Sequence, residues 1–447
     1  MSLQSLSIGV SGLRSHQTRL DTVSNNIANS STTAFKRQRA AFSEELGQEI
    51  LGVGRTAGGS AINPSKVGRG VSVASIDRDF GQGSLNDTGI KTDLALNGDG
   101  FFIASPKSGA ASDQRRLTRA GNFSFNQNGE LVTANGLNVK GWEFDDSGTL
   151  DTGELKDVQF DPNAQSSAKV TEDISIGGNL SADLSTNGAS PGETTSISTV
   201  VYDNQGESKS VTVEFERVQS RDEGDPTDQW EFTIEDGEGN VLDDPGGPPN
   251  GSTPNTLEFD ADGNVTSVDG TGVNPNSPGT FEANFGWDIN DDGAQETLSL
   301  AFGDETGGSV TQYSGSTTTT VTSQDGRSSG ELAGFQFTPE GALELNYTNG
   351  VQDQLFQLAI GNVNNPNGLE QQGDNFFTTT SASGDLQLGQ AGRDLQTSVV
   401  SGSLESSNVD LAKEFSDLIK AQRSYQASSQ IITTADEVLN QTVQLKR

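Results

Sequence analysis

The chain has 447 residues, of which 31% are hydrophobic, and it contains 54 glycines, one histidine and no cysteine. This length predicts roughly two to four domains, and the shortage of imidazole and thiol groups excludes most enzyme designs and most zinc and haem sites. A net charge of -35 disfavours binding to nucleic acid or to anionic membranes.

The negative charge is concentrated in the middle of the chain. Residues 1–46 carry five basic and three acidic side chains, whereas residues 404–447 carry five basic and six acidic ones. Near-neutral ends can pack against copies of themselves, because they do not repel one another. The acidic middle is either ordinary solvated surface, as in a salty habitat, or a surface with a specific role.

The beginning of the chain lacks the features of a cleaved secretion signal. Its first residues, MSLQSLSIGV, contain no basic region, no long apolar run and no small-residue cleavage site. No stretch is apolar over the length of a membrane span, so no membrane insertion is expected. The absence of cysteine fits export from the cell. We therefore expect any export to proceed without removal of a signal peptide.

Residues 1–30 have the apolar period of a helix. Four apolar residues recur every seven positions, and two more occupy interleaved positions. The residues that recur every seven positions are Leu6, Leu13, Leu20 and Ile27, and the interleaved residues are Leu3 and Val10. Gly9 and Gly12 each lower the intrinsic helix propensity by about 1 kcal/mol. We therefore expect this helix to be marginal on its own.

Residues 404–447 predict a second, longer helix. Apolar or aromatic residues again recur every seven positions, and three further residues flank this row. The row consists of Leu411, Leu418, Tyr425, Ile432 and Leu439, flanked by Phe415, Ile419 and Val443. Asn408 is the expected N-cap, and Asp410 lies in the first turn, where the helix dipole favours negative charge.

The two apolar rows could pack on the core of their own domain or on copies of the chain. Burying about ten such side chains contributes about 15–30 kcal/mol. Ordering both terminal segments costs on the order of 100 kcal/mol of backbone entropy, which helical hydrogen bonds offset only in part. Because the rows are narrow and lie at opposite ends of the chain, we predict that they form coiled-coil interfaces between copies in a homopolymer.

Between the helices the pattern changes to short β-strands with polar turns. Alternating apolar residues predict strands in both halves of this region, with acidic turns in its centre. The predicted strands include residues 71–76, 94–96, 101–103, 123–125, 131–132, 199–202, 211–215, 230–232, 335–337, 343–347 and 355–360. The predicted fold class is therefore mainly β with α-helical coiled-coil termini.

The strand patterns before and after the acidic centre resemble each other, which predicts nested domains that are discontinuous in sequence. The predicted domains are a terminal helical domain (1–30 and 404–447), an extended linker (31–70), a middle β domain (71–165 and 326–403) and an inserted outer β domain (166–325). We expect an elongated subunit of a tubular polymer.

One segment matches the start of a calcium-binding loop. Asp288, Asn290 and Asp292 have the D-x-N-x-D-G spacing, but the twelfth position is Ser299, where such a loop has a bidentate Glu. An acidic hairpin turn explains the same residues, so both interpretations stay open. His16 lies within the first helix without a catalytic constellation around it. We expect no enzyme activity and no cofactor.

Several motifs occur in order along the chain, at residues 25–29, 33–36, 81–83, 98–102, 118–123, 402–411, 422–426 and 433–437. They resemble the motifs of the flagellar rod and hook protein family. The motif residues carried over to this chain are Asn26, Asn29, Phe35, Lys36, Asn408, Asp410, Gln422 and Arg423. Ala34 stands where this family usually has Gly, so the local turn is expected to differ.

The resemblance implies a subunit of the flagellar hook, a curved tube that acts as a universal joint between rod and filament. An enlarged distal rod protein is the alternative within the family, and the large insert at residues 166–325 favours the hook. The implied partners are further copies of the chain, the distal rod, the hook cap, the hook–filament junction proteins and the flagellar type III export apparatus. The implied location is extracellular, on the flagellum.

An alternative from another class is an extracellular calcium-binding adhesin or glycan-binding β protein. It depends on the segment at Asp288 and on the acidic turns. Calcium-dependent thermal stability or glycan binding would favour this alternative, whereas polymerisation into tubes would favour the flagellar one.

Overall fold

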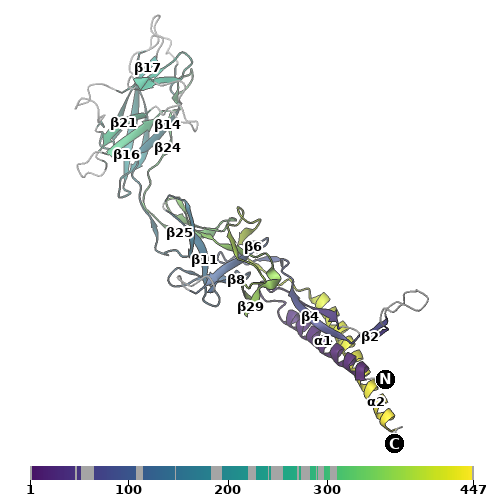
Figure 1. The fold of residues 1–447 in the computed structure, drawn as a ribbon. Coiled ribbons are helices and arrows are strands. Elements are labelled where there is room, and N and C mark those ends of the chain that lie inside the picture. The colour runs from purple at the N-terminus through teal and green to yellow at the C-terminus, as the bar shows by residue number, and fades with distance from the viewer. Residues whose placement is uncertain are drawn as a thin grey trace. The chain divides into compact units, whose positions relative to one another are not determined.

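Two terminal helices and many β-strands make up the computed structural model (Figure 1). The structure describes residues 3–45, 48–51, 65–106, 114–145, 147–182, 194–219, 228–239, 241–242, 255–268, 271–272, 282–287, 289, 296–302 and 310–444. The helices are α1 (Leu3–Ala28) and α2 (Leu411–Gln444). The predicted fold class, mainly β with a helix at each end, is confirmed. Among the described residues, no helix is long and apolar enough to cross a membrane.

The chain forms two compact units. Unit 1 contains Met1–Pro162, Gly334–Leu345 and Gln352–Arg447, and unit 2 contains Asn163–Ala333 and Asn346–Val351. Unit 1 therefore includes both terminal helices and the strands nearest to them in sequence. The finer division into four domains, with the predicted boundaries, remains a proposal.

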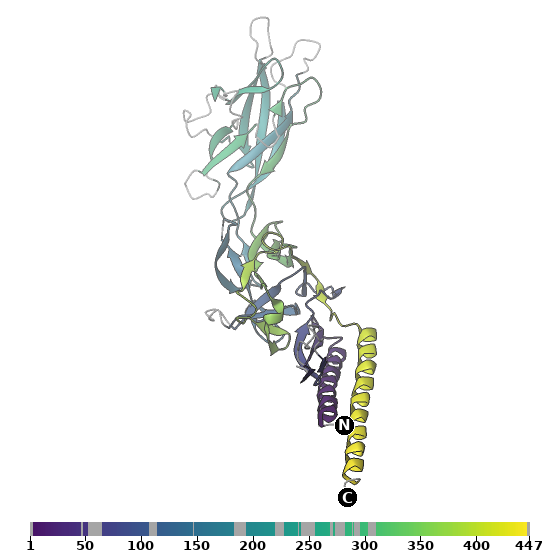
Figure 2. The ribbon, with the colours of Figure 1, turned by 45° about the vertical axis from the view of Figure 1, so that its right-hand side comes forward.

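The helices α1 and α2 lie side by side in unit 1 (Figure 2). Asp410 is the N-cap of α2, because its Oδ1 accepts hydrogen bonds from the backbone N–H groups of Ala412 (2.9 Å) and Lys413 (3.2 Å). The prediction of Asn408 as the cap is wrong. The Asn408 side chain instead accepts a hydrogen bond from the backbone N–H of Arg37, at 2.7 Å.

A two-stranded antiparallel sheet of β1 (Gln38–Glu44) and β4 (Val71–Arg78) lies against α1. The Ser15 hydroxyl of α1 donates a hydrogen bond to the backbone carbonyl of Val71, at 3.3 Å. Residues 31–70, which were expected to form an extended linker, therefore contain strand β1. Strand β4, which begins the predicted middle β domain, packs on α1. The strands β2 (Gln48–Leu51) and β3 (Ser65–Val67) form another antiparallel pair.

The larger sheet of unit 1 has the strand order β25-β26-β27-β11-β7-β8-β30-β29 over most of its width. These strands are β7 (Phe101–Ser105), β8 (Arg116–Thr118), β11 (Asn138–Phe144), β25 (Gly330–Phe337), β26 (Ala342–Tyr347), β27 (Gln352–Leu358), β29 (Glu370–Gly373) and β30 (Phe376–Thr378). Every residue of β7 is buried, which places the core of unit 1 on this sheet.

The remaining strands of unit 1 either pair with this sheet or form two separate two-stranded sheets. They are β5 (Leu85–Asp87), β6 (Leu94–Asn97), β9 (Phe123–Phe125), β10 (Leu131–Thr133), β12 (Leu150–Asp157), β28 (Ile360–Asn362), β31 (Gln387–Gly389), β32 (Ser398–Ser401) and β33 (Ser403–Glu405), with the 3-10 helix η2 (Pro366–Gly368). The antiparallel pair β5–β33 brings Glu405 next to Leu85. The strands predicted at residues 123–125 and 131–132 are confirmed as β9 and β10, an antiparallel pair in which Phe125 lies opposite Leu131.

Unit 2 consists of two principal sheets around one apolar core. The first sheet has the order β15-β16-β17-β18-β19-β20, and the second has β21-β22-β14-β23 with β24 also on β14. These strands are β14 (Asp173–Asn179), β15 (Thr194–Tyr202), β16 (Ser208–Gln219), β17 (Asp228–Asp236), β18 (Asn255–Phe259), β19 (Val265–Val268), β20 (Thr271–Gly272), β21 (Glu282–Trp287), β22 (Glu296–Ala301), β23 (Val310–Thr311) and β24 (Thr320–Gln324). Strand β13 (Gln165–Ser166) is outside both sheets and pairs with Gly330 and Glu331. Phe215 and Phe232 of the first sheet and Leu300 of the second belong to this core.

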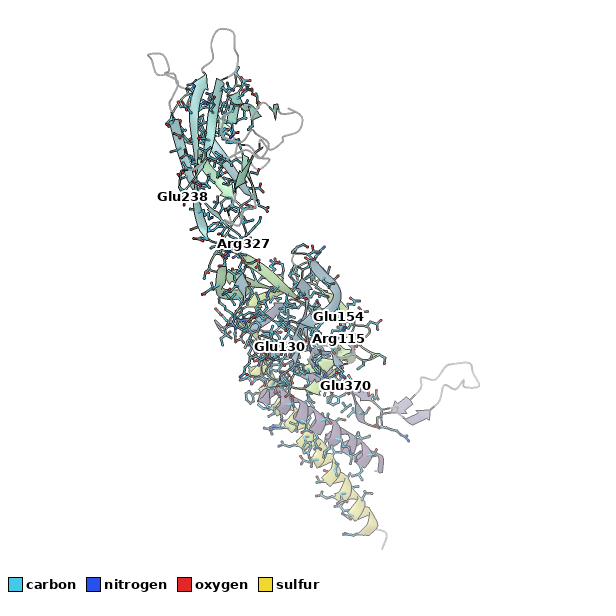
Figure 3. All side chains as sticks on the ribbon, turned by 90° about the vertical axis from the view of Figure 1, so that its left-hand side faces the viewer. Arg115, Glu130, Glu154, Glu238, Arg327 and Glu370 are labelled. Carbon is cyan, nitrogen blue, oxygen red and sulfur yellow. The ribbon has the colours of Figure 1, made fainter. Side chains whose placement is uncertain are left out.

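The acidic turns predicted in this region are present where the structure describes them. After β17, the N–H of Glu238 donates to Oδ1 of Asp236 at 2.9 Å, and Gly239 has a φ of 84°. Figure 3 labels Glu238 in this turn. A positive φ favours glycine, so the sequence pattern explains the turn. The calcium-loop residues Asp288, Asn290 and Asp292 lie outside the described residues.

Two glutamates lie opposite each other on adjacent strands of the first sheet of unit 2. Glu231 on β17 pairs directly with Glu216 on β16. Burial, and then the charge of Glu216, raise the pKa of Glu231 above its ordinary value. A carboxyl whose folded-state pKa is raised destabilises the fold as the pH rises through the unfolded-state pKa and then the folded-state pKa. Like charges opposite each other in a sheet are unfavourable for the same reason.

Replacing Glu231 by Gln is therefore expected to raise the thermal unfolding midpoint at neutral pH. The gain should disappear at pH values below the ordinary carboxyl pKa, where both forms are uncharged. Thermal unfolding followed by circular dichroism from acidic to neutral pH measures this difference. An equal gain at every pH would contradict the electrostatic explanation.

Candidate assembly surface and terminal junction

The two ends of the chain are joined just outside the helices. The backbone N–H of Ala34 donates to the carbonyl of Glu405 at 2.8 Å, and that of Asn408 donates to the carbonyl of Phe35 at 3.3 Å. The Asn408 amide also donates to the carbonyl of Gly81, at 2.9 Å. We call this contact of residues 34–37, 79–83 and 405–408 the terminal junction.

A buried ion-pair triad lies at the terminal junction. The Lys36 ammonium is 2.7 Å from Oε1 of Glu405, and Nη1 of Arg119 is 3.6 Å from Oε2 of the same carboxylate. The side chains of Lys36, Glu405 and Arg119 are 1%, 0% and 4% exposed. Burial lowers the pKa of both cations, and Glu405 opposes that shift in each case. The carboxylate therefore compensates two desolvated charges at once.

A second buried carboxylate joins the helices to each other. Glu414, in the first turn of α2, pairs with the guanidinium of Arg37 and accepts a hydrogen bond from the Asn26 amide at 3.0 Å. Asn26 also donates to the carbonyl of Gln38 at 2.8 Å and accepts from its N–H at 2.9 Å. Asn26 and Glu414 are both fully buried. These contacts fix the end of α1 to the beginning of α2.

The structure brings some of the predicted motif residues together and leaves others apart. Lys36 and Asn408 take part in the terminal junction through their side chains, and Asn26 lies beside it. Phe35 is buried next to them. Asn29 instead closes the end of α1, where its Oδ1 accepts from the Thr32 hydroxyl at 3.1 Å. Gln422 and Arg423 are exposed on α2, away from the junction.

Two glycines of α1 lie close to side chains of α2. A Cβ added at Gly9 would lie 2.9 Å from the Ile432 side chain, and one added at Gly12 would lie 3.1 Å from the Ser428 hydroxyl. Ala421 of α2 is fully buried. The two glycines therefore lower helix propensity but permit close packing.

Most residues of the apolar rows remain partly accessible in the single chain. On α1, five described row residues are half-buried: Leu6, Val10, Leu13, Leu20 and Ile27. On α2, four are half-buried: Leu418, Tyr425, Ile432 and Leu439. The side chains of Leu3 and Val443 lie outside the described residues. At the beginning of α2, Leu411, Phe415 and Ile419 are 43%, 51% and 55% exposed.

Leu411, Phe415 and Ile419 are four residues apart and thus lie on one face of α2. The face toward α1 instead carries Glu414 and Ala421, which are buried. Because these three apolar side chains are not covered by α1, another helix can pack against them. We call the face formed by Leu411, Phe415 and Ile419 the α2 apolar face.

Sequence reasoning did not single out several residues of the junction. Arg119 and Glu405 lie within the motifs at residues 118–123 and 402–411, which do not indicate that these charges pair, and Arg37 and Glu414 lie outside the motifs. The sequence signal for Arg119 and Glu405 is that each is a charged residue within a motif of mostly small and apolar residues. Only a contact between distant segments shows that these charges pair.

Ala34 has a φ of 56°, which is the left-handed conformation expected where the family usually has Gly. Ala34 is 1% exposed. Replacing Ala34 by Val is expected to lower the free energy of unfolding by about 2–3 kcal/mol, because a β-branched side chain is strained there. Replacing Ala34 by Gly should change it by less than about 1 kcal/mol. Urea unfolding of both variants measures the difference, and equal effects would contradict the strain explanation.

The described residues contain no group of three or more His, Asp or Glu side chains that could hold a metal ion. His16 is half-buried on α1, and its ring lies edge-on to Phe42, with centroids 6.2 Å apart. Burial, and then the charge of Arg19, lower the pKa of His16.

Comparison with known families matches four regions of the chain. Residues 6–36 match the family described as "Flagella basal body rod protein", and residues 95–179 match "Flagellar hook protein FlgE/F/G D1 domain". Residues 179–327 match "Flagellar basal body protein FlaE D2 domain", and residues 400–445 match "Flagellar basal body rod FlgEFG protein C-terminal". The first of these regions covers most of α1 and residues 34–36 of the terminal junction, and the last contains α2 and residues 405–408.

Individual relatives match over nearly their whole lengths. The flagellar hook protein FlgE of Treponema pallidum is 32% identical, with 100% of both chains covered, and that of Borreliella burgdorferi is 34% identical over 99% of this chain and 100% of its own. The Escherichia coli FlgE is 32% identical over 98% of each chain.

The crystal structure of Helicobacter pylori flagellar hook protein FlgE2 resembles this fold with a TM-score of 0.53 at 14% identity. It covers 72% of this chain and 100% of that one. At this identity the likeness supports the fold alone, whereas the sequence matches extend over both helices and the strands between them. The chain belongs to the flagellar hook protein family.

Proposed function

We propose that this chain is the structural subunit of a flagellar hook and polymerises into a curved tube that passes torque from rod to filament. The observation that carries the proposal is the α2 apolar face, with three large side chains about half exposed on one face of a terminal helix. Copies of the chain bury this face when terminal helices pack together.

The partial exposure of the row residues on α1 supports the same assignment. Ile432 packs at Gly9 within one chain, but the row residues are only half-buried there, so part of their apolar surface is available to neighbours. Near-neutral terminal segments can pack closely in a polymer, because little charge repulsion opposes them. The terminal helices therefore form the inner part of the tube.

The finer assignments also belong to this proposal. The partners are further copies of the chain, the distal rod, the hook cap, the hook–filament junction proteins and the flagellar type III export apparatus. The protein lies outside the cell on the flagellum and is exported without a cleaved signal peptide. No catalytic role is proposed. The match of residues 179–327 to a D2 domain favours the hook over a distal rod protein.

Replacing Phe415 by Asp tests the proposal. We expect this variant to lose tube formation, because polymerisation would then bury a charge in an apolar interface. The stability of the monomer should change little, since the Phe415 side chain is 51% exposed. Electron microscopy of the purified full chain at raised concentration or salt measures polymerisation, and circular dichroism measures thermal unfolding.

The matched control is Ser416 replaced by Asp. Ser416 is exposed and lies next to Phe415, but it is outside the α2 apolar face. It receives the same charge in the same turn of α2, so tubes should still form. Tubes from both variants, or from neither, would contradict a specific role for this face. An unmodified chain that never forms tubes would overturn the proposed function itself.

A further inference from the structure

We propose that Lys36, Glu405 and Arg119 form the connection through which torque passes between the terminal helices and the β-sheet of unit 1. The inference rests on the proposed function, because it assigns a mechanical role to one part of a hook subunit.

The triad joins three segments that are connected to α1, to α2 and to the larger sheet. Lys36 lies between α1 and β1, Glu405 ends β33 just before α2, and Arg119 directly follows β8. Strand β8 is an internal strand of the larger sheet, paired with β7 and β30. One carboxylate therefore connects the chain leaving α1, the chain entering α2 and the sheet.

Each member of the triad is also fixed to the backbone. The Lys36 ammonium donates to the carbonyl of Gly81 at 3.0 Å, and the Arg119 guanidinium donates to that of Gly98 at 2.7 Å. Oε1 of Glu405 accepts the backbone N–H of Gly83 at 2.8 Å. Each of these hydrogen bonds ties a charged side chain to a backbone group, so moving that side chain away from its backbone partner stretches a bond.

Apolar packing alone would give a different mechanical response. Contacts between apolar side chains are non-directional, so packed surfaces can slide with little change in buried area. Charged hydrogen bonds in a dry environment weaken steeply as their geometry is lost. Within the triad, Lys36 donates a hydrogen bond to Glu405 at 2.7 Å, and Arg119 forms an ion pair with it at 3.6 Å. The three side chains are 1%, 0% and 4% exposed, so bulk water does not reach these contacts.

Stability alone does not account for three buried charges. Replacing a buried ion-pair network by apolar residues of similar volume is often neutral or stabilising. What such a network adds over an apolar core is a defined relative orientation of the segments that it joins. In a subunit that transmits torque, resistance to reorientation is the property required at this point.

The test is a full-length chain with the triple substitution Lys36→Met, Glu405→Met and Arg119→Met, expressed in place of the normal gene in the source bacterium. We expect an unchanged or higher thermal unfolding midpoint, hooks of normal form by electron microscopy and normal swimming in dilute medium. Swimming should be lost in viscous medium, where the drag on the filament and the torque through the hook are largest. The torsional stiffness of isolated hooks should fall in parallel.

The matched control replaces Lys156 and Glu143 by Met. This ion pair also lies in unit 1, but its side chains are 47% and 43% exposed, so it should not affect swimming at any viscosity. The conservative variant Arg119→Lys keeps the charge and loses the planar guanidinium, so we expect an intermediate loss of swimming in viscous medium.

The possible outcomes separate the inference from the proposed function. Normal swimming of the triple variant at every viscosity would overturn the inference, and so would a triple variant that no longer folds, because the triad would then serve stability. A folded triple variant that builds no hooks would assign the triad to assembly and would also overturn it. Absence of hooks with the unmodified chain would instead reject the proposed function.

Discussion

Replacing Glu405 by Ala is expected to lower the free energy of unfolding by about 3–5 kcal/mol. The Glu405 side chain is fully buried between Lys36 and Arg119, whose side chains are 1% and 4% exposed. Removal of the carboxylate leaves two buried cations facing each other without a counter-charge. Neither can regain the hydration that it lost on folding. Denaturant unfolding of the full chain, followed by circular dichroism, measures the loss.

The matched control is Glu143 replaced by Ala. Glu143 also pairs with a lysine, Lys156, but both side chains are almost half exposed, so water replaces the lost partner. We expect a change within about 1 kcal/mol. Similar losses for the two variants would contradict the view that burial determines the effect. The Glu405 variant differs from the triple Met variant because it breaks the triad without removing its cations.

Replacing Gly83 by Ala is expected to cost about 3 kcal/mol and to separate the segments of the terminal junction. A Cβ at this position would lie 2.0 Å from the carbonyl oxygen of Ser406, and 3.0 Å from its carbonyl carbon. Both are backbone atoms, which cannot move aside by a change of side-chain rotamer. The displacement would also stretch the hydrogen bond from Gly83 to Glu405. Unfolding midpoints and hook assembly both measure the effect.

The control for this substitution is Gly334 replaced by Ala. Gly334 is in β25, and the nearest neighbour of an added Cβ would be the Lys91 ammonium, at 3.8 Å. We expect unchanged or slightly increased stability, since Ala restricts the unfolded chain more than Gly does. A large loss at Gly334, or none at Gly83, would show that steric overlap at the junction is not the cause.

The terminal helices and many strands could be predicted because their signals are local. A row of apolar residues every seven positions indicates a helix with one apolar face, and the alternation at Phe123 and Phe125 indicates a strand. The departure at Ala34 was also visible from the sequence, and the structure places it at a φ of 56°. The motif resemblance extended these signals to a family.

Period alone does not identify the partner of an apolar face. The apolar rows of both helices were predicted to form interfaces between copies of the chain. That role remains a prediction. Within one chain the helices meet through Gly9, Gly12 and Ser428, because small side chains permit the closest approach. The same limit applies to caps. Both Asn408 and Asp410 can cap a helix, and the tertiary contact of Asn408 with Arg37 leaves the role to Asp410.

The sequence by itself therefore determined the helices, the β character of the middle and the family. The tertiary structure alone decided the terminal junction, because Lys36 and Glu405 are 369 positions apart and no local pattern relates them. Helical and strand periods follow from backbone geometry, which repeats over a few residues. The pairing of buried charges follows from which distant segments the fold brings together, since each charge requires a partner once water is excluded.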